Sequence, residues 1–190
     1  EDDIKQYFGK DSSNFVDDGI KVERKVELYE HQTVSLQEIQ KRRDAGIKAF
    51  LIVLPTAAGK SKIVEEDLRT FAEGKQKFRG LILVPGVNLL LDWEERIKAS
   101  LPELKDKIDI RTYAFAARHY TDTTPDYYNY LIVDEAHHAV APVLKRVVQY
   151  YRTAFTIGLT ATDQRPDKRK LETVFGSYTT SLSLKEAMEK

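Results

Sequence analysis

Two short stretches of the chain carry the residue types that phosphate and metal chemistry require. The first is Gly59-Lys60-Ser61, which follows the apolar run 51–54, typical of a strand buried on both faces of a sheet. Small residues let backbone N–H groups surround phosphate oxygens, and a helix N-terminus favours an anion. At these positions a lysine binds the outer phosphates and a serine binds Mg²⁺. The pattern indicates a phosphate-binding loop; because Leu54 replaces the usual first glycine, an ordinary strand–turn–helix is the alternative.

The second stretch is an acid pair, Asp134-Glu135, which directly follows the apolar residues 130–133. A buried strand that ends in two carboxylates is costly unless the charges meet a cation. Mg²⁺ that bridges nucleotide phosphates is the natural cation, so we expect Asp134 to hold the metal. Glu135 would then orient and deprotonate a water molecule. A single acid here could also be a helix cap, but its combination with a phosphate loop favours the metal site.

The elements that must position these residues alternate between strand and helix. We expect strands at 49–54, 81–84, 108–113, 130–133 and 155–159, and helices at 28–44, 60–71, 88–99, 142–151 and 182–188. This alternation predicts an α/β fold, with a mostly parallel sheet covered by helices on both faces. The carboxyl ends of parallel strands lie at one edge of the sheet, so the phosphate loop and the acid pair would meet there.

Some charged and aromatic residues carry local predictions. Lys60 should lie exposed in its loop, and the acidic run 65–67 should be the solvated face of its helix. The tyrosines at 127, 128 and 130 should pack beside the fourth strand, with stacking on nucleic-acid bases as the alternative. Two adjacent histidines on a helix cannot face one metal ion. We therefore expect His137 to hydrogen-bond towards Thr160 or a partner domain, and His138 to pack.

Length and composition bound the class of protein. The 190 residues suit one domain, with an extension at 1–27 and the domain at 28–190. Lysine plus arginine and aspartate plus glutamate both number 30, so any nucleic-acid binding must come from a local groove. The absence of cysteine excludes thiol catalysis and zinc–thiolate sites and fits a cytoplasmic protein. No stretch approaches the roughly 20 apolar residues of a membrane span, so no membrane partner is expected.

The motifs occur in the order of the first RecA-like domain of superfamily 2 helicases and translocases, which the chain resembles over residues 28–190. Residues 134–137 spell Asp-Glu-Ala-His, the DEAH form of the Walker B box. The segments 28–32, 55–61, 84–86, 111–113 and 158–162 resemble the glutamine motif and motifs I, Ia, Ib and III. The DEAH box followed by His138, together with motif III and Arg165, looks most like the type III restriction enzyme and DNA-repair helicase branch.

The resemblance implies the ATP-binding half of a nucleic-acid-dependent ATPase, with ATP and Mg²⁺ as cofactors and DNA rather than RNA as the expected partner. Residues that it implies for nucleotide binding are Gln32, Pro55, Thr56, Ala57, Ala58, Gly59, Lys60 and Ser61. It implies Ser61 and Asp134 for the metal, Lys60 and Glu135 for catalysis, His137, Thr160 and Thr162 for coupling, and Pro85, Gly86 and Thr112 for nucleic-acid contact.

In this family, arginines from a second RecA-like domain complete the active site. The chain starts at Glu1 and has its only methionine at 188, so we expect a fragment or a processed chain that lacks this second domain and is nearly inactive alone. Two alternatives stay open. One is a nucleotide-gated interaction module without unwinding activity, and the other is a double-strand DNA translocase of the chromatin-remodelling kind.

Overall fold

The computed structural model describes residues 28–54, 59–161, 171–174 and 181–182. The predicted extension at 1–27 lies outside the described residues. So do Pro55, Thr56, Ala57 and Ala58 of the phosphate loop, Thr162 of motif III, and the basic side chain Arg165. The remaining predicted site residues are described, together with the elements that carry them.

The centre of the molecule is a six-stranded sheet in the order β3-β2-β4-β5-β1-β6, in which every described pairing is parallel. The strands are β1 (Ala49–Val53), β2 (Gly80–Val84), β3 (Ile108–Thr112), β4 (Tyr130–Val133), β5 (Phe155–Thr160) and β6 (Ser181–Leu182). Every residue of β1, β2, β4 and β5 is buried, as expected for apolar runs in a sheet covered on both faces.

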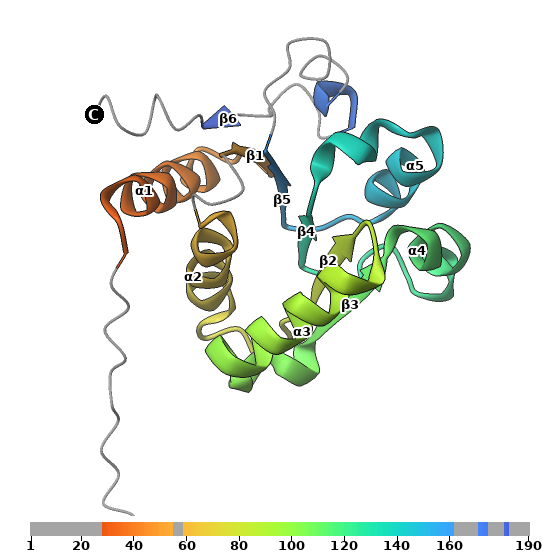
Figure 1. The fold of residues 1–190 in the computed structure, drawn as a ribbon, viewed down its shortest axis with the longest axis horizontal. Coiled ribbons are helices and arrows are strands. Elements are labelled where there is room, and N and C mark those ends of the chain that lie inside the picture. Colours follow the sequence, from red (N-terminus) through yellow and green to blue (C-terminus); the bar gives the residue numbers. More distant parts are fainter. Residues whose placement is uncertain (1–27, 55–58, 162–170, 175–180, 183–190) are drawn as a thin grey trace, which may run out of the picture.

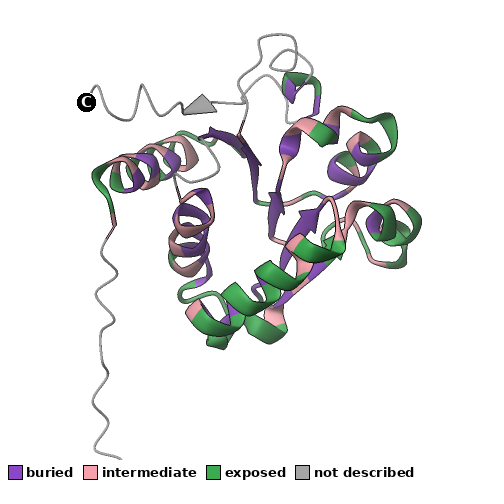
Figure 2. Cartoon of the chain, in the orientation of Figure 1, coloured by how far each residue is buried: buried purple, intermediate pink, exposed green. Residues whose placement is uncertain are grey.

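Helices cover both faces of this sheet (Figure 1). They are α1 (Glu30–Asp44), α2 (Lys60–Ala72), α3 (Val87–Ser100), α4 (Tyr113–His119) and α5 (Pro142–Tyr150), with short 3-10 helices η2 (Pro102–Lys107), η3 (Tyr120–Asp122) and η4 (Ala136–Val140). Side chains from α1, α2 and α3 form the core on one face, and side chains from α4 and α5 form the core on the other. Figure 2 shows the buried strands between helices whose outer faces are exposed.

The predicted α/β fold is confirmed, and the five expected strands are present with bounds within one residue of the prediction. Two elements differ. Leu182 was expected to begin a helix, but it lies in β6, because its backbone pairs with Ile52 at the edge of the sheet. The sequence also gave no prediction of α4, in which Tyr113 is the first residue instead of the end of a strand.

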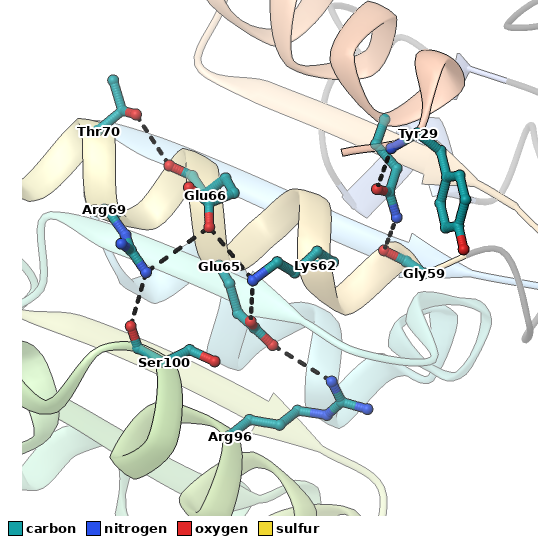
Figure 3. Close-up of polar contacts among 10 residues, drawn as sticks. Tyr29, Gly59, Lys62, Glu65, Glu66, Arg69, Thr70, Arg96 and Ser100 are labelled. Carbon is teal, nitrogen blue, oxygen red and sulfur yellow. Dashed lines mark hydrogen bonds and ion pairs between the residues drawn. The ribbon is translucent and has the colours of Figure 1, made fainter. Parts of the chain in front are cut away.

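The prediction of a solvated acidic face on α2 is wrong. Glu65 and Asp67 are buried, with 2% and 3% of their surfaces exposed. Asp67 accepts a hydrogen bond from Arg43 of α1 at 2.6 Å and another from the Tyr130 hydroxyl. Glu65 lies 3.4 Å from Arg96 of α3 (Figure 3). Because α2 packs between α1 and α3, its acids face the basic side chains of both neighbours rather than water.

Two of the three tyrosines that were predicted to pack beside β4 are buried. Tyr130 and Tyr128 are buried, which confirms packing for both, whereas Tyr127 is 39% exposed. Burial, followed by the neighbouring Asp67 carboxylate, raises the pKa of Tyr130 well above its ordinary value.

No helix within the described ranges has the length and apolar character needed to cross a bilayer.

Candidate functional site at the carboxyl edge of the sheet

The carboxyl ends of β1, β5 and β4 lie side by side, because β5 pairs with both of the other strands. Val53 is in register with Thr160, and Val133 is in register with Gly158. Beyond the end of β1, the Leu54 N–H donates to the Thr160 carbonyl at 3.1 Å. The phosphate loop, the acid pair and motif III are therefore brought to one edge of the sheet.

Lys60 is the first residue of α2, and the prediction that it lies exposed in the loop is wrong. Its side chain is 7% exposed, and its Nζ donates to the Leu54 carbonyl at 2.8 Å. The helix starts after Gly59, whose φ of 73° lies in the left-handed region that favours glycine. An ammonium has three N–H donors, so two remain for phosphate oxygens.

Two carboxylates, those of Glu135 and Asp134, lie near the Lys60 ammonium. Burial lowers the pKa of Lys60, and the nearby carboxylates of Glu135 and Asp134 act in the opposite direction. The lysine therefore lies close enough to both acids to interact with them, while each keeps separate hydrogen-bond partners. Phosphate oxygens would act in the same direction as the two acids and favour the charged ammonium.

Two N–H groups hold the carboxylate of Asp134, which is 8% exposed. The Trp93 indole Nε1 donates to Oδ2 at 2.9 Å, and the backbone N–H of Glu135 donates to Oδ1 at 2.9 Å. The hydroxyl of Tyr113 donates to the Asp134 carbonyl and lies 3.4 Å from the Glu135 carbonyl. Burial, and then the charges of Asp134 and Glu135, raise the pKa of Tyr113, so this hydroxyl keeps its proton and stays a donor.

Glu135 has an unusual backbone conformation. Its φ of 49° and ψ of 50° place it in the left-handed region, and it is the one non-glycine residue with positive φ among those that the structure describes. Non-glycine residues in this region cost about 1–3 kcal/mol and cluster at functional sites. The turn ends β4 abruptly and starts η4, so that the Glu135 side chain leaves the sheet at the same edge as Asp134.

His137 connects the acid pair to motif III. Its Nδ1 lies 3.3 Å from Thr160 Oγ1, which confirms the predicted hydrogen bond, and 3.4 Å from Glu135 Oε2. Thr160 is fully buried at the end of β5. The prediction that His138 packs into the fold is wrong, because His138 is exposed, with its ring centroid 4.0 Å from that of His137.

A cleft of about 400 Å³ brings together the predicted phosphate, metal and catalytic residues that the structure describes. It is lined by Gly59, Lys60, Ser61, Lys62, Leu89, Asp92, Trp93, Arg96, Asp134 and Glu135. Sequence reasoning did not assign the α3 residues of this wall to the site. The sequence predicts Trp93 on the inward face of its helix and, by resemblance, within motif Ia, and neither prediction connects it to the metal site. A buried indole N–H needs a polar partner, and this need could have indicated the contact.

Around the cleft, α2 and α3 are joined by polar contacts (Figure 3). Glu65 lies 3.6 Å from Lys62 and 3.4 Å from Arg96. One turn further along α2, Arg69 donates to the Ser100 carbonyl at 2.7 Å. These contacts hold the two helices that form the walls of the cleft.

Gln32 touches the phosphate loop. It is 3% exposed, its Oε1 accepts a hydrogen bond from the Tyr29 N–H at 3.0 Å, and its Nε2 lies 3.5 Å from the Gly59 carbonyl. A Cβ atom added at Gly59 would lie 2.4 Å from that Nε2. The amide therefore fixes the start of α1 and abuts the loop, while adenine recognition by Gln32 stays a prediction.

The three predicted nucleic-acid residues lie at the carboxyl ends of neighbouring strands. Pro85 and Gly86 connect β2 to α3, and Thr112 is the last residue of β3, in register with Val84 of β2. The Thr112 hydroxyl accepts a hydrogen bond from the Phe115 N–H at 3.2 Å and so caps α4. The structure places the three residues at neighbouring strand ends, and their contact with nucleic acid stays a prediction.

The family model of the type III restriction enzyme, res subunit, matches residues 25–115 and 105–165. The chain belongs to this family of superfamily 2 helicases and translocases. Among curated relatives, it is 30% identical over 159 residues to "DNA 3'-5' translocase XPB2" of Sulfurisphaera tokodaii, covering 77% of this chain and 33% of the relative. It is 31% identical over 156 residues to "Putative ATP-dependent helicase IRC3" of Saccharomyces cerevisiae, covering 68% and 22%.

A solved structure shows the same fold. The Pyrococcus furiosus Hef helicase domain superposes with a TM-score of 0.66 at 19% identity, over 82% of this chain and 38% of that chain. At this identity the match supports the RecA-like helicase fold alone. The chain spans about a third or less of the length of both curated relatives.

Proposed function

We propose that this family member is the ATP-binding half of a DNA-dependent ATPase that acts as a helicase or translocase. The observation that carries the proposal is the cleft in which Lys60, Ser61, Asp134 and Glu135 meet. These residues would bind phosphate, hold the metal and activate water, and they lie together although their two motifs are far apart in sequence. Under the proposal, Gln32 and the loop residues 55–58 complete the nucleotide contacts.

The donor set fits Mg²⁺ held together with nucleotide phosphates. No group of three or more histidine, cysteine or acidic side chains suited to a metal occurs within the described residues, so no all-protein metal cage is present there. Mg²⁺ prefers one or two carboxylates plus phosphate oxygens and retained waters. Asp134 and the Ser61 hydroxyl supply such a partial set. The bound metal would neutralise developing charge on the phosphates.

The chain's own residues then have distinct tasks. Lys60 donates to the phosphates from the start of α2, whose N-terminal end favours an anion. Glu135 accepts the proton of the attacking water, and its left-handed backbone presents the carboxylate beside Asp134. His137 and Thr160 form the connection through which the nucleotide state would reach the nucleic-acid groove, and the resemblance to motif III assigns Thr162 to the same role.

DNA is the proposed partner. One curated relative is named a DNA translocase, and this name supports DNA rather than RNA for the present chain. The groove would use backbone groups and side chains near Pro85, Gly86 and Thr112 at the carboxyl ends of β2 and β3. A groove built largely from backbone groups agrees with the zero formal net charge of the sequence.

We further propose that residues 28–190 form one RecA-like domain that works with a second one. Phosphoryl transfer needs positive charge on the developing γ-phosphate, and an arginine finger supplies about 10³–10⁵ in rate. The chain alone should therefore bind nucleotide and hydrolyse it slowly. The small share of the relatives' length that the chain spans supports this division.

The test compares steady-state ATP hydrolysis by residues 1–190 with hydrolysis by a longer protein that includes the second RecA-like domain, each with and without DNA. The proposal expects slow turnover by the chain alone and DNA-stimulated turnover by the longer protein. Equal, DNA-stimulated rates in both would contradict the half-site proposal. ATP binding without DNA-stimulated turnover in the longer protein would instead favour a nucleotide-gated interaction module.

Translocation without strand separation is the second candidate, since the relative XPB2 is named a translocase rather than a helicase. The chemistry of the cleft is the same in both cases. A strand-displacement assay on the longer protein, run beside a triplex-displacement assay, separates them. Triplex displacement without strand displacement would establish the translocase.

A further inference from the structure

The contact between Trp93 and Asp134 joins a helix on one face of the sheet to the end of a central strand. Trp93 is 1% exposed and lies in the core beneath α3, yet its Nε1 reaches Asp134 Oδ2 at 2.9 Å. Both atoms are buried, so the bond is shielded from water. A buried N–H without a partner is costly, and Asp134 satisfies this donor.

We infer that Trp93 is a positioning residue, which fixes the Asp134 carboxylate in the orientation that the metal requires. This inference rests on the proposed function. The indole N–H holds Oδ2 and the Glu135 N–H holds Oδ1, so each carboxylate oxygen has its own donor. Each carboxylate oxygen accepts up to two hydrogen bonds, so each keeps a lone pair for a cation or its waters.

The partners of Asp134 are neutral donors, and this supports a positioning role rather than a purely structural one. A structural pair would neutralise the carboxylate with an arginine or lysine, as Arg43 does for Asp67. Trp93 orients Asp134 without cancelling its charge, so the attraction for a cation is preserved. Groups that hold metal ligands in this way typically contribute 10- to 100-fold in metal affinity or activity.

Trp93 also connects the metal site to a segment proposed to contact nucleic acid. Helix α3 begins after Gly86, one of the proposed nucleic-acid contacts, and Trp93 lies two turns further along the same helix. A displacement of α3 by bound DNA would therefore move the donor that orients Asp134. Strand β3, the neighbour of β2, ends at Thr112, and the next residue, Tyr113 of α4, donates to the Asp134 carbonyl. Asp134 is thus held by donors from α3 and α4, the two helices that directly follow the proposed nucleic-acid contacts.

The test measures affinity for a fluorescent ATP analogue on residues 1–190, with Mg²⁺ and with EDTA. Trp93→Phe keeps an aromatic ring in the core and removes the N–H donor. We expect its affinity in Mg²⁺ to fall about tenfold and its affinity in EDTA to stay within twofold of the wild type. Ile97→Val is the matched control, since Ile97 is 2% exposed on the same helix and has no polar role. It should leave both affinities unchanged.

A second measurement uses the wild-type chain and keeps the inference testable if Trp93→Phe does not fold. Trp93 is the only tryptophan in the sequence, so the intrinsic emission reports on the indole beside Asp134. Binding of Mg-ATP should shift this emission, because a cation at Asp134 changes the field at the indole, whereas ATP in EDTA should shift it much less.

The outcomes separate the inference from the proposed function. Absence of nucleotide binding by the folded wild-type chain would overturn the proposed function and the inference together. Mg²⁺-dependent binding that Trp93→Phe retains in full would overturn the inference alone. Equal losses in Mg²⁺ and EDTA would assign Trp93 to packing. An emission unmoved by saturating Mg-ATP would likewise contradict a metal at Asp134.

Discussion

Two buried aspartates, Asp67 and Asp134, are almost equally removed from solvent and have opposite surroundings. Asp67 on α2 accepts from the Arg43 guanidinium at 2.6 Å, and that guanidinium lies over the Phe155 ring at 4.2 Å. Asp134 at the end of β4 is held by the N–H groups of Trp93 and Glu135. Within the described part of the chain, no ion pair with a basic side chain involves Asp134. The first charge is neutralised by a direct ion pair, whereas the second has neutral hydrogen-bond donors and interacts with the Lys60 ammonium without a direct ion pair.

The comparison separates acids that stabilise the fold from acids that serve chemistry. An arginine partner neutralises a buried carboxylate, and removing either partner leaves a costly isolated charge. Neutral donors instead retain the charge for a ligand that arrives later. A separate observation places Glu135 among the acids that serve chemistry: its left-handed backbone is a strained feature of the kind that occurs at functional sites.

The largest expected effect is on hydrolysis. Glu135→Gln keeps the shape of the side chain but cannot accept a proton, so turnover should fall by roughly two to four orders of magnitude. Nucleotide affinity should hold or rise. The measurement is steady-state hydrolysis in a protein that includes the second RecA-like domain, with Glu66→Gln on α2 as the control. Wild-type turnover in Glu135→Gln would assign Glu135 to structure, alongside Glu66.

The α1–α2 pair should show the opposite behaviour. Arg43→Met removes the guanidinium and leaves Asp67 buried without its cation, so the free energy of unfolding should fall by about 3–5 kcal/mol. Adding Asp67→Asn should restore part of the loss, because the isolated charge is then gone. Urea unfolding measures both variants. If the folded fraction of Arg43→Met bound Mg-ATP more weakly than the wild type, the separation of the two regions would fail.

Lys60→Ala should weaken nucleotide binding by roughly 10- to 100-fold, the value of charge-assisted hydrogen bonds to phosphate. The buried position of Lys60 adds a small cost in stability, because the Leu54 carbonyl loses its donor. Fluorescence titration with an ATP analogue measures the affinity, and Lys98→Ala on the exposed face of α3 is the control. Unchanged affinity in Lys60→Ala would refute the phosphate-loop assignment.

The smallest effect concerns alkaline stability. Burial raises the pKa values of Tyr113, Tyr128, Tyr130 and Tyr151 above the ordinary 10.0. The unfolded chain therefore releases these protons at lower pH than the folded chain. The stabilisation that comes from these protons should be fully present below pH 10 and should decrease above it, by up to about 1.4 kcal/mol per pH unit for each group. Tyr113→Phe and Tyr130→Phe should each reduce this slope in pH-dependent unfolding. An unchanged slope would show that the replaced hydroxyl titrates normally.

Much of the fold follows from local patterns in the sequence. The apolar runs at 81–84 and 130–133 predict buried strands because nothing polar interrupts them. The motifs at Lys60 and Asp134 predict a shared site because parallel strands end at one edge. These features depend on a few neighbouring residues, so a single chain reveals them.

What the sequence could not predict depends on tertiary contacts. The acids Glu65 and Asp67 look like a solvated face until α1 and α3 bring Arg43 and Arg96 against them. The strand at Leu182 exists through its pairing with β1 and has no periodicity of its own. The bond from Trp93 to Asp134 joins residues 41 positions apart, so neither residue alone indicates it.

The most direct test of the account is the Mg²⁺ dependence of ATP binding in Asp134→Asn, measured beside Asp67→Asn with thermal unfolding of both. The account predicts that Asp134→Asn loses most of the affinity gained from Mg²⁺ while its melting temperature stays at or above that of the wild type. Asp67→Asn should lower the melting temperature and keep the Mg²⁺ effect. A stable Asp134→Asn variant with an undiminished Mg²⁺ effect would contradict the central claim that Asp134 is kept charged for the metal.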